Sequence, residues 1–269
     1  MTVPVDAERL TDHLVTSGRY SAVTVIPSTG STNADLAAAA DLGAADRTVL
    51  IAEEQTAGQG RLARTWTSPR GEGLYVSVLL RPNGVPTGRR GWIALLAGVA
   101  LVRTARFAGA QATLKWPNDL LLGLDRHKGA GVLAESRGES VILGIGLNVS
   151  TTPEDIQVGP GGLPGTSLAA VGAMVLDRTE LAAKLLTELA DEFDAWLAAA
   201  GDPHASGLYA EYKGSCDTIG QRVRVELPAE QVTGVATNLT GEGMLLVKTD
   251  DGVERPVSAG DVVHLRPAS

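Results

Sequence analysis

The chain has 269 residues and a formal net charge of -8, from 23 lysines and arginines against 31 aspartates and glutamates. This acidity argues against a general binder of nucleic acid or anionic membranes, because both need surplus positive charge. The single cysteine excludes an intrachain disulfide framework and fits a reducing, cytoplasmic setting. The N-terminal residues lack a basic stretch followed by an apolar core, so we expect no secretory signal. The longest apolar run, Trp92 to Val102, is too short to span a membrane.

The first half of the chain alternates short apolar runs with helical patterns, which predicts a domain that mixes strands and helices. Ser31 or Thr32 can cap an alanine-rich helix, because a hydroxyl accepts from the free N–H groups of the first turn. Pro117 should divide residues 113–122 into two short strands around a turn. In chain order we expect a helix at 6–19, strands at 22–26, 49–53 and 73–81, a helix at 89–107, and strands at 131–135 and 140–149.

The second half begins with a helix and ends in short strands. Asp177, followed three residues later by Glu180, resembles a capping box and should open a helix whose leucines recur at helical spacing. A second short helix is expected at 204–212. The remaining residues form short alternating runs punctuated by tight turns, as in a small SH3-like β-barrel. We therefore expect an α+β chain with a larger domain at 1–215 and a barrel at 216–269.

The segment 55–70 concentrates positive charge in an acidic chain. It contains no acidic residue, and Arg61 and Arg64 follow the glycines at 58 and 60. Glycine lets backbone N–H groups approach a ligand closely, and guanidinium groups match phosphate or carboxylate oxygens. Composition alone slightly favours the alternative of a solvated surface loop with incidental arginines. The segment is neither a Walker A sequence nor a full dinucleotide fingerprint.

A second chemical segment is Lys115-Trp116-Pro117-Asn118-Asp119, between two apolar runs. Asp119 can hold Mg²⁺ or orient one of two lysines, Lys115 and Lys128. Asn118 can donate to a ligand carbonyl. The alternative is a core tryptophan followed by an ordinary turn.

Two glycine-containing segments follow. Lys128 precedes small residues at 129–131 that leave space beside it, although most lysines are simply solvated. The glycines of GIGLN at 144–148 lie inside a predicted strand, where glycine indicates close approach of a ligand or another backbone.

Together these segments closely resemble one family, the biotin–protein ligases. The resemblance covers roughly residues 22–200, and the predicted C-terminal barrel also fits the family. The motifs occur in the family's order: STN at 31–33, EEQTAGQGR at 53–61, Trp66, KWPND at 115–119, KGAG at 128–131 and GIGLN at 144–148.

The resemblance implies a reaction in two steps. The carboxylate of biotin attacks the α-phosphate of ATP, with Mg²⁺ on the phosphate oxygens, and yields biotinyl-5′-adenylate and pyrophosphate. A lysine of a biotin carboxyl carrier domain then takes the biotinyl group. Only about twenty residues precede the first predicted strand, too few for a helix-turn-helix unit, so the monofunctional form without DNA binding is expected. The assembly is left open between monomer and homodimer.

The resemblance also implies roles for individual residues, with residues 55–67 as a lid that excludes water. The catalytic residues are Lys128, Arg61 and Asp119, the last also a candidate metal ligand. The biotin site is assigned to Ser31, Thr32, Asn33, Gln55, Gln59, Gly60, Arg61, Lys128 and Gly131. The ATP and adenylate site is assigned to Arg61, Arg64, Trp66, Lys115, Asn118 and Asn148. Gln59 stands where the family often has arginine, so one charge on the phosphate side is absent.

Other functions remain as alternatives. A lipoate–protein ligase is the nearest, but KWPND with KGAG favours biotin. An octanoyltransferase needs a nucleophilic cysteine in the catalytic domain, whereas Cys216 lies at the predicted boundary. A non-catalytic biotin or nucleotide sensor is disfavoured by the presence of Lys128 and Arg61. An interaction module built on the barrel leaves 55–70 and 115–131 without a role.

Overall fold

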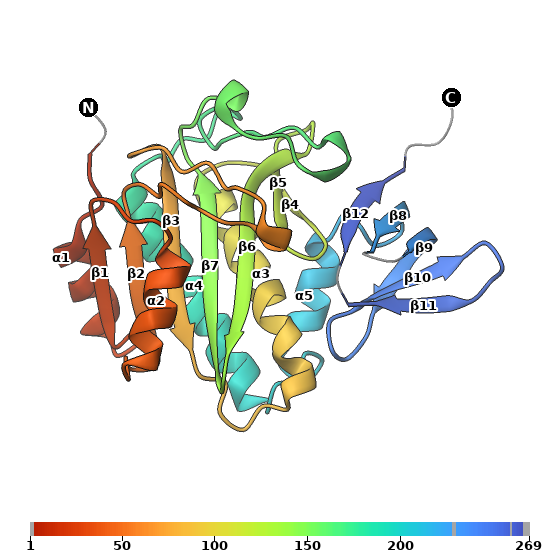
Figure 1. The fold of residues 1–269 in the computed structure, drawn as a ribbon, viewed down its shortest axis with the longest axis horizontal. Helices are drawn as coiled ribbons and strands as arrows, with labels where there is room; N and C mark the ends of the chain where they lie inside the picture. The colour runs from red at the N-terminus through yellow and green to blue at the C-terminus, as the bar shows by residue number, and fades with distance from the viewer. Residues whose placement is uncertain (1–2, 228–229, 259, 266–269) are drawn as a thin grey trace.

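The larger part of the molecule is a seven-stranded sheet with helices on both faces (Figure 1). The computed structural model describes residues 3–227, 230–258 and 260–265. Strand order is β1-β2-β3-β7-β6-β5-β4, with β1 parallel to β2 and the other neighbours antiparallel. The expected α+β class is confirmed. The strands are β1 (Ala22–Ile26), β2 (Thr48–Ala52), β3 (Gly73–Leu80), β4 (Ala112–Lys115), β5 (Asp119–Leu122), β6 (His127–Arg137) and β7 (Ser140–Asn148).

The helices divide between the two faces of this sheet. Helix α2 (Thr32–Asp41) contacts β3 and β7 on one face, while α3 (Trp92–Phe107) and α4 (Arg178–Ala198) cover the other (Figure 1). The expected caps are present, since Ser31 accepts from the N–H of Ala34 and Asp177 accepts from two N–H groups of the first turn of α4. The remaining helices are α1 (Ala7–Leu10), which continues as a π-helical turn (Thr11–Val15), and α5 (Leu208–Ser215).

The main core lies between the sheet and helices α3 and α4. Helix α3 is apolar around most of its circumference because it packs against both the sheet and α4. The leucines of α4 at positions 181, 185 and 189 are fully buried, as their helical spacing predicts. This core covers the face of the sheet that packs against α3 and α4. The opposite face, which carries α2, is where the cavity forms.

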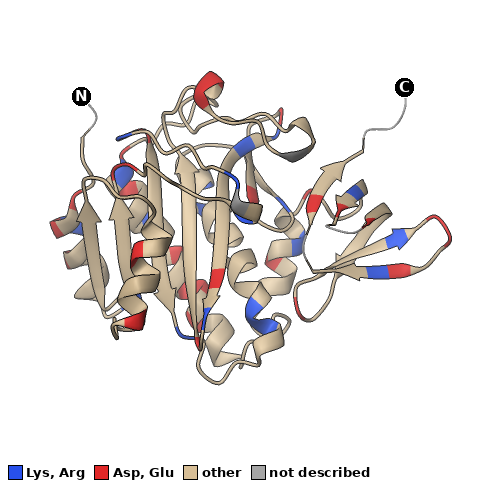
Figure 2. Ribbon diagram, in the orientation of Figure 1, with Lys and Arg blue, Asp and Glu red and all other residues tan. Residues whose placement is uncertain are grey.

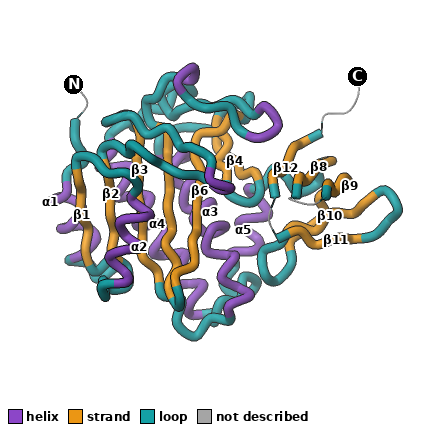
Figure 3. The backbone as a smooth tube through the Cα atoms, in the orientation of Figure 1, coloured by secondary structure: helices purple, strands orange, loops and turns teal. Residues whose placement is uncertain are grey.

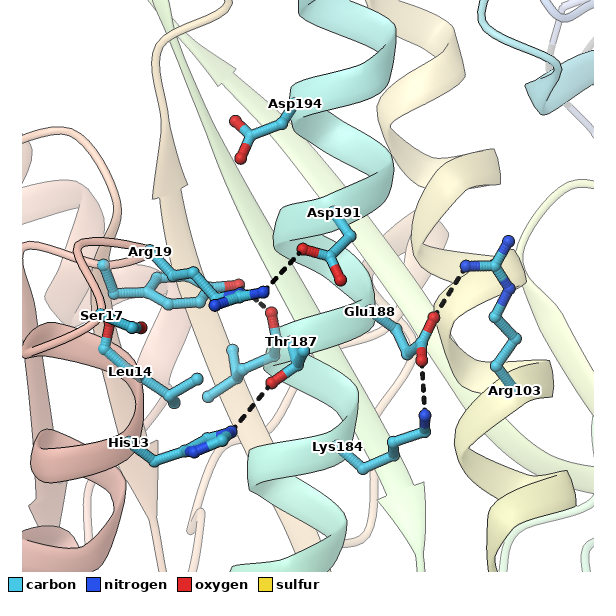
Figure 4. A network of polar contacts seen from close by, with 12 residues as sticks. His13, Leu14, Ser17, Arg19, Arg103, Lys184, Thr187, Glu188, Asp191 and Asp194 are labelled. Atoms are coloured by element: carbon cyan, nitrogen blue, oxygen red, sulfur yellow. Dashed lines mark hydrogen bonds and ion pairs between the residues drawn. The ribbon is translucent and has the colours of Figure 1, made fainter.

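Polar contacts attach the N-terminal helical segment to the exposed side of α4 (Figure 4). Arg19 pairs with Asp191 at 3.2 Å, and the His13 ring lies 3.3 Å from the Thr187 hydroxyl. Further along α4, Glu188 lies between Lys184 and Arg103. An exposed pair such as Arg19 with Asp191 contributes roughly 0–1 kcal/mol. The contacts of Arg19 and His13 orient the N-terminal segment, and none of these contacts stabilises the fold as much as the apolar core does.

The C-terminal part is a separate antiparallel sheet of order β11-β10-β9-β8-β12, which confirms the expected small β domain. Two indoles of the larger domain donate to its turn: Trp92 Nε1 to Gly241 O at 2.9 Å, and Trp116 Nε1 to Gly243 O at 3.1 Å. The turn is therefore docked against α3 and the KWPND segment. The strands are β8 (Arg222–Glu226), β9 (Gln231–Leu239), β10 (Leu245–Thr249), β11 (Glu254–Val257) and β12 (Asp261–His264).

Loops gather at the upper end of the larger sheet (Figure 3). There the segment 55–70 and the segment 149–167 both reach the same cavity. Along the ribbon of these loops, basic and acidic positions alternate with uncharged ones (Figure 2). Within the described ranges, no helix is long and apolar enough to cross a membrane.

Candidate active site

The cavity forms on strands β6 and β7 because their pleat separates small from large residues. On β7, Gly144, Gly146 and Asn148 line the cavity, whereas Leu143 and Leu147 belong to the core on the other face. The antiparallel register places Gly131 of β6 opposite Gly146. The result is a floor without bulky side chains beneath a cavity of about 380 Å³.

Trp66 lies directly on this glycine floor. A Cβ atom added at Gly146 would be 2.5 Å from Trp66 Nε1, and one added at Gly131 would be 3.2 Å from the same ring. Lys128 Nζ is 5.5 Å from the centroid of the indole, within reach of a cation–π interaction. Trp66 therefore forms an apolar wall beside the ammonium group.

Lys128 is held by its backbone and by a carboxylate. Its Nζ lies 2.6 Å from Asp119 Oδ1, and both side chains are largely buried. The Lys128 N–H donates to Pro164 O, and its carbonyl accepts from the Thr166 N–H. A charged ammonium is thus fixed at one position in the cavity wall.

Among the residues that the structure describes, no group of three or more His, Cys, Asp and Glu side chains is placed to hold a metal ion. The two carboxylates that line the cavity, Asp119 and Asp261, each already pair with a cation. Asp119 as a metal ligand therefore stays a prediction.

Two arginines connect the lid segment with the small domain. Arg61 Nη1 donates to Asn118 Oδ1 at 3.2 Å and to Gly260 O at 3.4 Å, and burial lowers the pKa of its guanidinium. Arg64 makes a two-point ion pair with Asp261 of β12. The hydrogen bond from Arg64 lowers the pKa of the Asp261 carboxyl. The small domain thus contributes part of the cavity wall.

The lid segment is folded back on itself above the cavity. The Trp66 N–H donates to Gly58 O at 2.8 Å, and the Gly60 N–H donates to Arg64 O at 2.7 Å. Gly58 is required for this close packing, since a Cβ there would lie 2.6 Å from Trp66 O. Movement of the segment as a lid stays a prediction.

The opposite end of the cavity is a polar cluster around the start of α2. Gln55 Oε1 accepts from the Thr32 N–H at 2.9 Å and lies 3.0 Å from the Thr32 hydroxyl. Gln55 Nε2 donates to Ser68. Asn33 donates to Glu135 at 2.6 Å and accepts from the buried hydroxyl of Ser77. This end can supply several directed hydrogen bonds to a small polar group.

Most residues expected at the site from the sequence meet in this one cavity. Lys115 differs, because it is buried outside the lining and its desolvation lowers its pKa. The residues that line the cavity as expected are Ser31, Thr32, Asn33, Gln55, Gln59, Gly60, Arg61, Arg64, Trp66, Asn118, Asp119, Lys128, Gly131 and Asn148.

Sequence reasoning missed several residues of the lining, among them two sets that carry polar groups. Residues 156–159 belong to the Gly/Pro-rich segment after β7, and Asp261 comes from the small domain. The Gly/Pro-rich segment follows GIGLN directly in the sequence, and this position could have indicated that residues 156–159 lie near the cavity. Nothing near Asp261 in the sequence marks it as part of a cavity.

The comparisons with known proteins agree with this geometry. Residues 25–151 match the biotin/lipoate A/B protein ligase family, and residues 218–265 match the biotin protein ligase C-terminal domain. A biotin–[acetyl-CoA-carboxylase] ligase of Mycobacterium tuberculosis is 41% identical over 98% of this chain and 97% of its own length. The chain belongs to the biotin–protein ligase family.

Other members of the family extend the comparison. The biotin protein ligase of Aquifex aeolicus, solved in complex with biotin and ATP, has a TM-score of 0.72 and 26% identity. The match covers 91% of this chain and 99% of that one. The bifunctional ligase/repressor BirA of Bacillus subtilis is 32% identical over 87% of this chain and 71% of its own length.

Proposed function

We propose that this chain is an ATP-dependent biotin–protein ligase, which activates biotin as biotinyl-5′-AMP and transfers it to a lysine of a biotin carboxyl carrier domain. The observation that carries the proposal is one cavity with a hydrogen-bonding cluster at one end and fixed cations at the other. A ligand with a polar ring, an apolar chain and a carboxylate matches this order of groups. Biotin has that order.

The first step joins two anions, so it needs positive charge. A carboxylate oxygen of biotin forms a bond to the α-phosphorus of ATP, the bond from that phosphorus to the bridging oxygen breaks, and pyrophosphate leaves. Lys128 and Arg61 would neutralise the charge that develops on the phosphate oxygens. Both cations are held in place before substrate arrives, by Asp119 and Asn118 respectively. Preorganisation of this kind avoids reorientation during the reaction.

The second step consumes the mixed anhydride. The amine of the carrier lysine attacks the acyl carbon, the bond to the phosphate oxygen breaks, AMP leaves and the amine loses a proton. Until then the adenylate must be kept from water. The folded segment with Trp66, together with residues 156–159, would cover it.

Mg²⁺ enters this proposal as part of the substrate MgATP. The paired state of Asp119 and Asp261 favours a metal held mainly by the phosphates. We further assign catalysis to residues 1–215 with the barrel at 216–269 supplying Asp261, and the reaction to the cytoplasm. Sedimentation velocity distinguishes the monomer from the homodimer.

Biotin-dependent exchange of labelled pyrophosphate into ATP tests the proposal, with lipoate in parallel. Lys128→Ala should reduce exchange about 10²- to 10³-fold, the typical effect of removing one donor aimed at developing charge. Lys248→Ala, on an exposed position of β10, is the matched control and should exchange normally. Exchange with lipoate alone would indicate a lipoate ligase. Binding of biotin without any exchange would indicate a sensor.

A further inference from the structure

A buried serine outside the cavity lining connects the residues of the polar cluster. Ser77 lies on β3 and is fully buried. Its Oγ is 2.6 Å from Asn33 Oδ1 and 2.8 Å from Thr32 Oγ1. In the sequence it is the one polar residue of the run Gly73-Leu-Tyr-Val-Ser-Val-Leu-Leu80 apart from the Tyr75 hydroxyl. A hydroxyl in such a position needs partners, because burying it unpaired is costly.

The Asn33 amide has a determined orientation. Its Nδ2 donates to the Glu135 carboxylate at 2.6 Å, so Oδ1 must be the atom that faces Ser77. Gly144 permits this arrangement, since a Cβ there would lie 2.3 Å from Asn33 Oδ1. Asn33 Oδ1 can only accept, and the single proton of the Ser77 hydroxyl is therefore donated to it over the shorter of the two contacts.

The proton of the Thr32 hydroxyl has two candidate acceptors within the protein, Ser77 Oγ at 2.8 Å and Gln55 Oε1 at 3.0 Å. Two hydroxyl oxygens 2.8 Å apart need a proton between them, and Ser77 has spent its own on Asn33, so Thr32 donates to Ser77 Oγ. Gln55 Oε1 already accepts from the Thr32 N–H. Thr32 Oγ1 then has no proton left for the cavity that it lines, and it can offer only lone pairs there. Thr32 is consequently an acceptor for whatever ligand group lies beside it.

We propose that Ser77 is a positioning residue that makes Thr32 an acceptor, so that this end of the cavity selects a ligand with an N–H donor. The proposal rests on the proposed function, under which that donor is an N–H of the ureido ring of biotin. A ligand whose ring presents only acceptors would face lone pairs and lose the interaction. Ser77 would thus set specificity without touching the ligand.

Four variants test the proposal: Ser77→Ala, Thr32→Val, the double variant, and Ser215→Ala as a control. Ser215 is a buried serine of α5 away from the cavity lining. The ligands are biotin and biotin methylated on both ureido nitrogens. Direct titration without ATP gives the Kd, and pyrophosphate exchange gives the KM for ATP.

Ser77→Ala should raise the Kd for biotin about 3- to 10-fold, as expected for loss of one hydrogen bond, and leave the KM for ATP unchanged. The Kd for methylated biotin should not change, so discrimination between the two ligands shrinks by the same factor. Thr32→Val should have a similar effect, and adding Ser77→Ala to it should change nothing further, because Ser77 acts through Thr32. Ser215→Ala should match the wild type in every measurement.

Three results would overturn the role of Ser77: a wild-type Kd for biotin in Ser77→Ala, additive effects in the double variant, or equal weakening for both ligands. Direct titration with biotin distinguishes a wrong role for Ser77 from a wrong proposed function. Wild-type protein that binds biotin but never exchanges pyrophosphate refutes the ligase activity, while the four Kd values still decide the role of Ser77. Wild-type protein that does not bind biotin refutes both.

Discussion

The contact between Trp66 and the glycine floor allows a sharp test by adding one methyl group. In Gly146→Ala the new Cβ would lie 2.5 Å from Trp66 Nε1 and 2.6 Å from Cε2. Ordinary contacts begin near 3.4 Å, so the indole has to move by about 1 Å. Trp66 lies on a loop and is only partly buried, and the ring should therefore swing away instead of straining the core.

The expected loss is in catalysis more than in stability. A displaced indole no longer forms the wall beside Lys128, and misplacement by about 1 Å can cost on the order of 10²-fold in rate. We expect biotin-dependent pyrophosphate exchange to fall about 10- to 100-fold. Gly214→Ala is the matched control, because a Cβ at that helical position meets nothing within 4 Å.

Fluorescence provides an independent measurement of the same movement. The chain has four tryptophans, and Trp92, Trp116 and Trp196 are each at most 2% exposed. Quenching by acrylamide therefore reports mainly on Trp66, and it should increase in Gly146→Ala. In a Trp66→Ala background the added methyl should cost nothing further. Wild-type exchange together with wild-type quenching in Gly146→Ala would refute the reasoning.

Two further predictions concern stability. Arg178→Met removes the partner of the buried Glu53 carboxylate, 2.7 Å away, and should lower the free energy of unfolding by about 3–5 kcal/mol in thermal or urea denaturation. Adding Glu53→Gln should recover part of the loss, and an unchanged midpoint in the single variant would contradict the prediction. Burial lowers the pKa of His264 to about 4, below the usual 6.5. The unfolded chain then binds more protons between these values, so stability is complete above pH 6.5 and falls toward pH 4, by on the order of 1–2 kcal/mol after solvent screening. His264→Gln should flatten that part of the profile, and an identical slope would show that other groups cause it.

The sequence alone predicted most of the elements near the site. The glycines of 144–148 and the strand alternation around them indicated close approach of a ligand, and β7 does place Gly144 and Gly146 on the cavity floor. The cap at Ser31 and the capping Asp177 were predictable because both depend on neighbours within one helical turn. The break at Pro117 was predictable because proline itself lacks the N–H that a strand ladder needs.

Contacts between residues far apart in the sequence were harder to predict. Lys115 and Asp119 belong to the same motif, KWPND. Lys115 is buried outside the cavity lining, whereas Asp119 lines the cavity and pairs with Lys128. Sequence pattern does not say which member of a motif faces a cavity, because that depends on how the strands pair. The bulge between β5 and β6 near Leu120 alters the pairing at this point.

The sequence by itself therefore determined the family motifs, the capped helices and the local concentration of positive charge in an acidic chain. Only the tertiary structure decided which partners meet those charges: Asp261 for Arg64, nearly two hundred residues away, and Ser77 for Thr32. Local patterns follow from backbone periodicity and nearest-neighbour hydrogen bonds, which are written in consecutive residues. Distant pairs depend on how the small domain docks and how β3 lies under α2, and many side chains contribute to each of those packings at once.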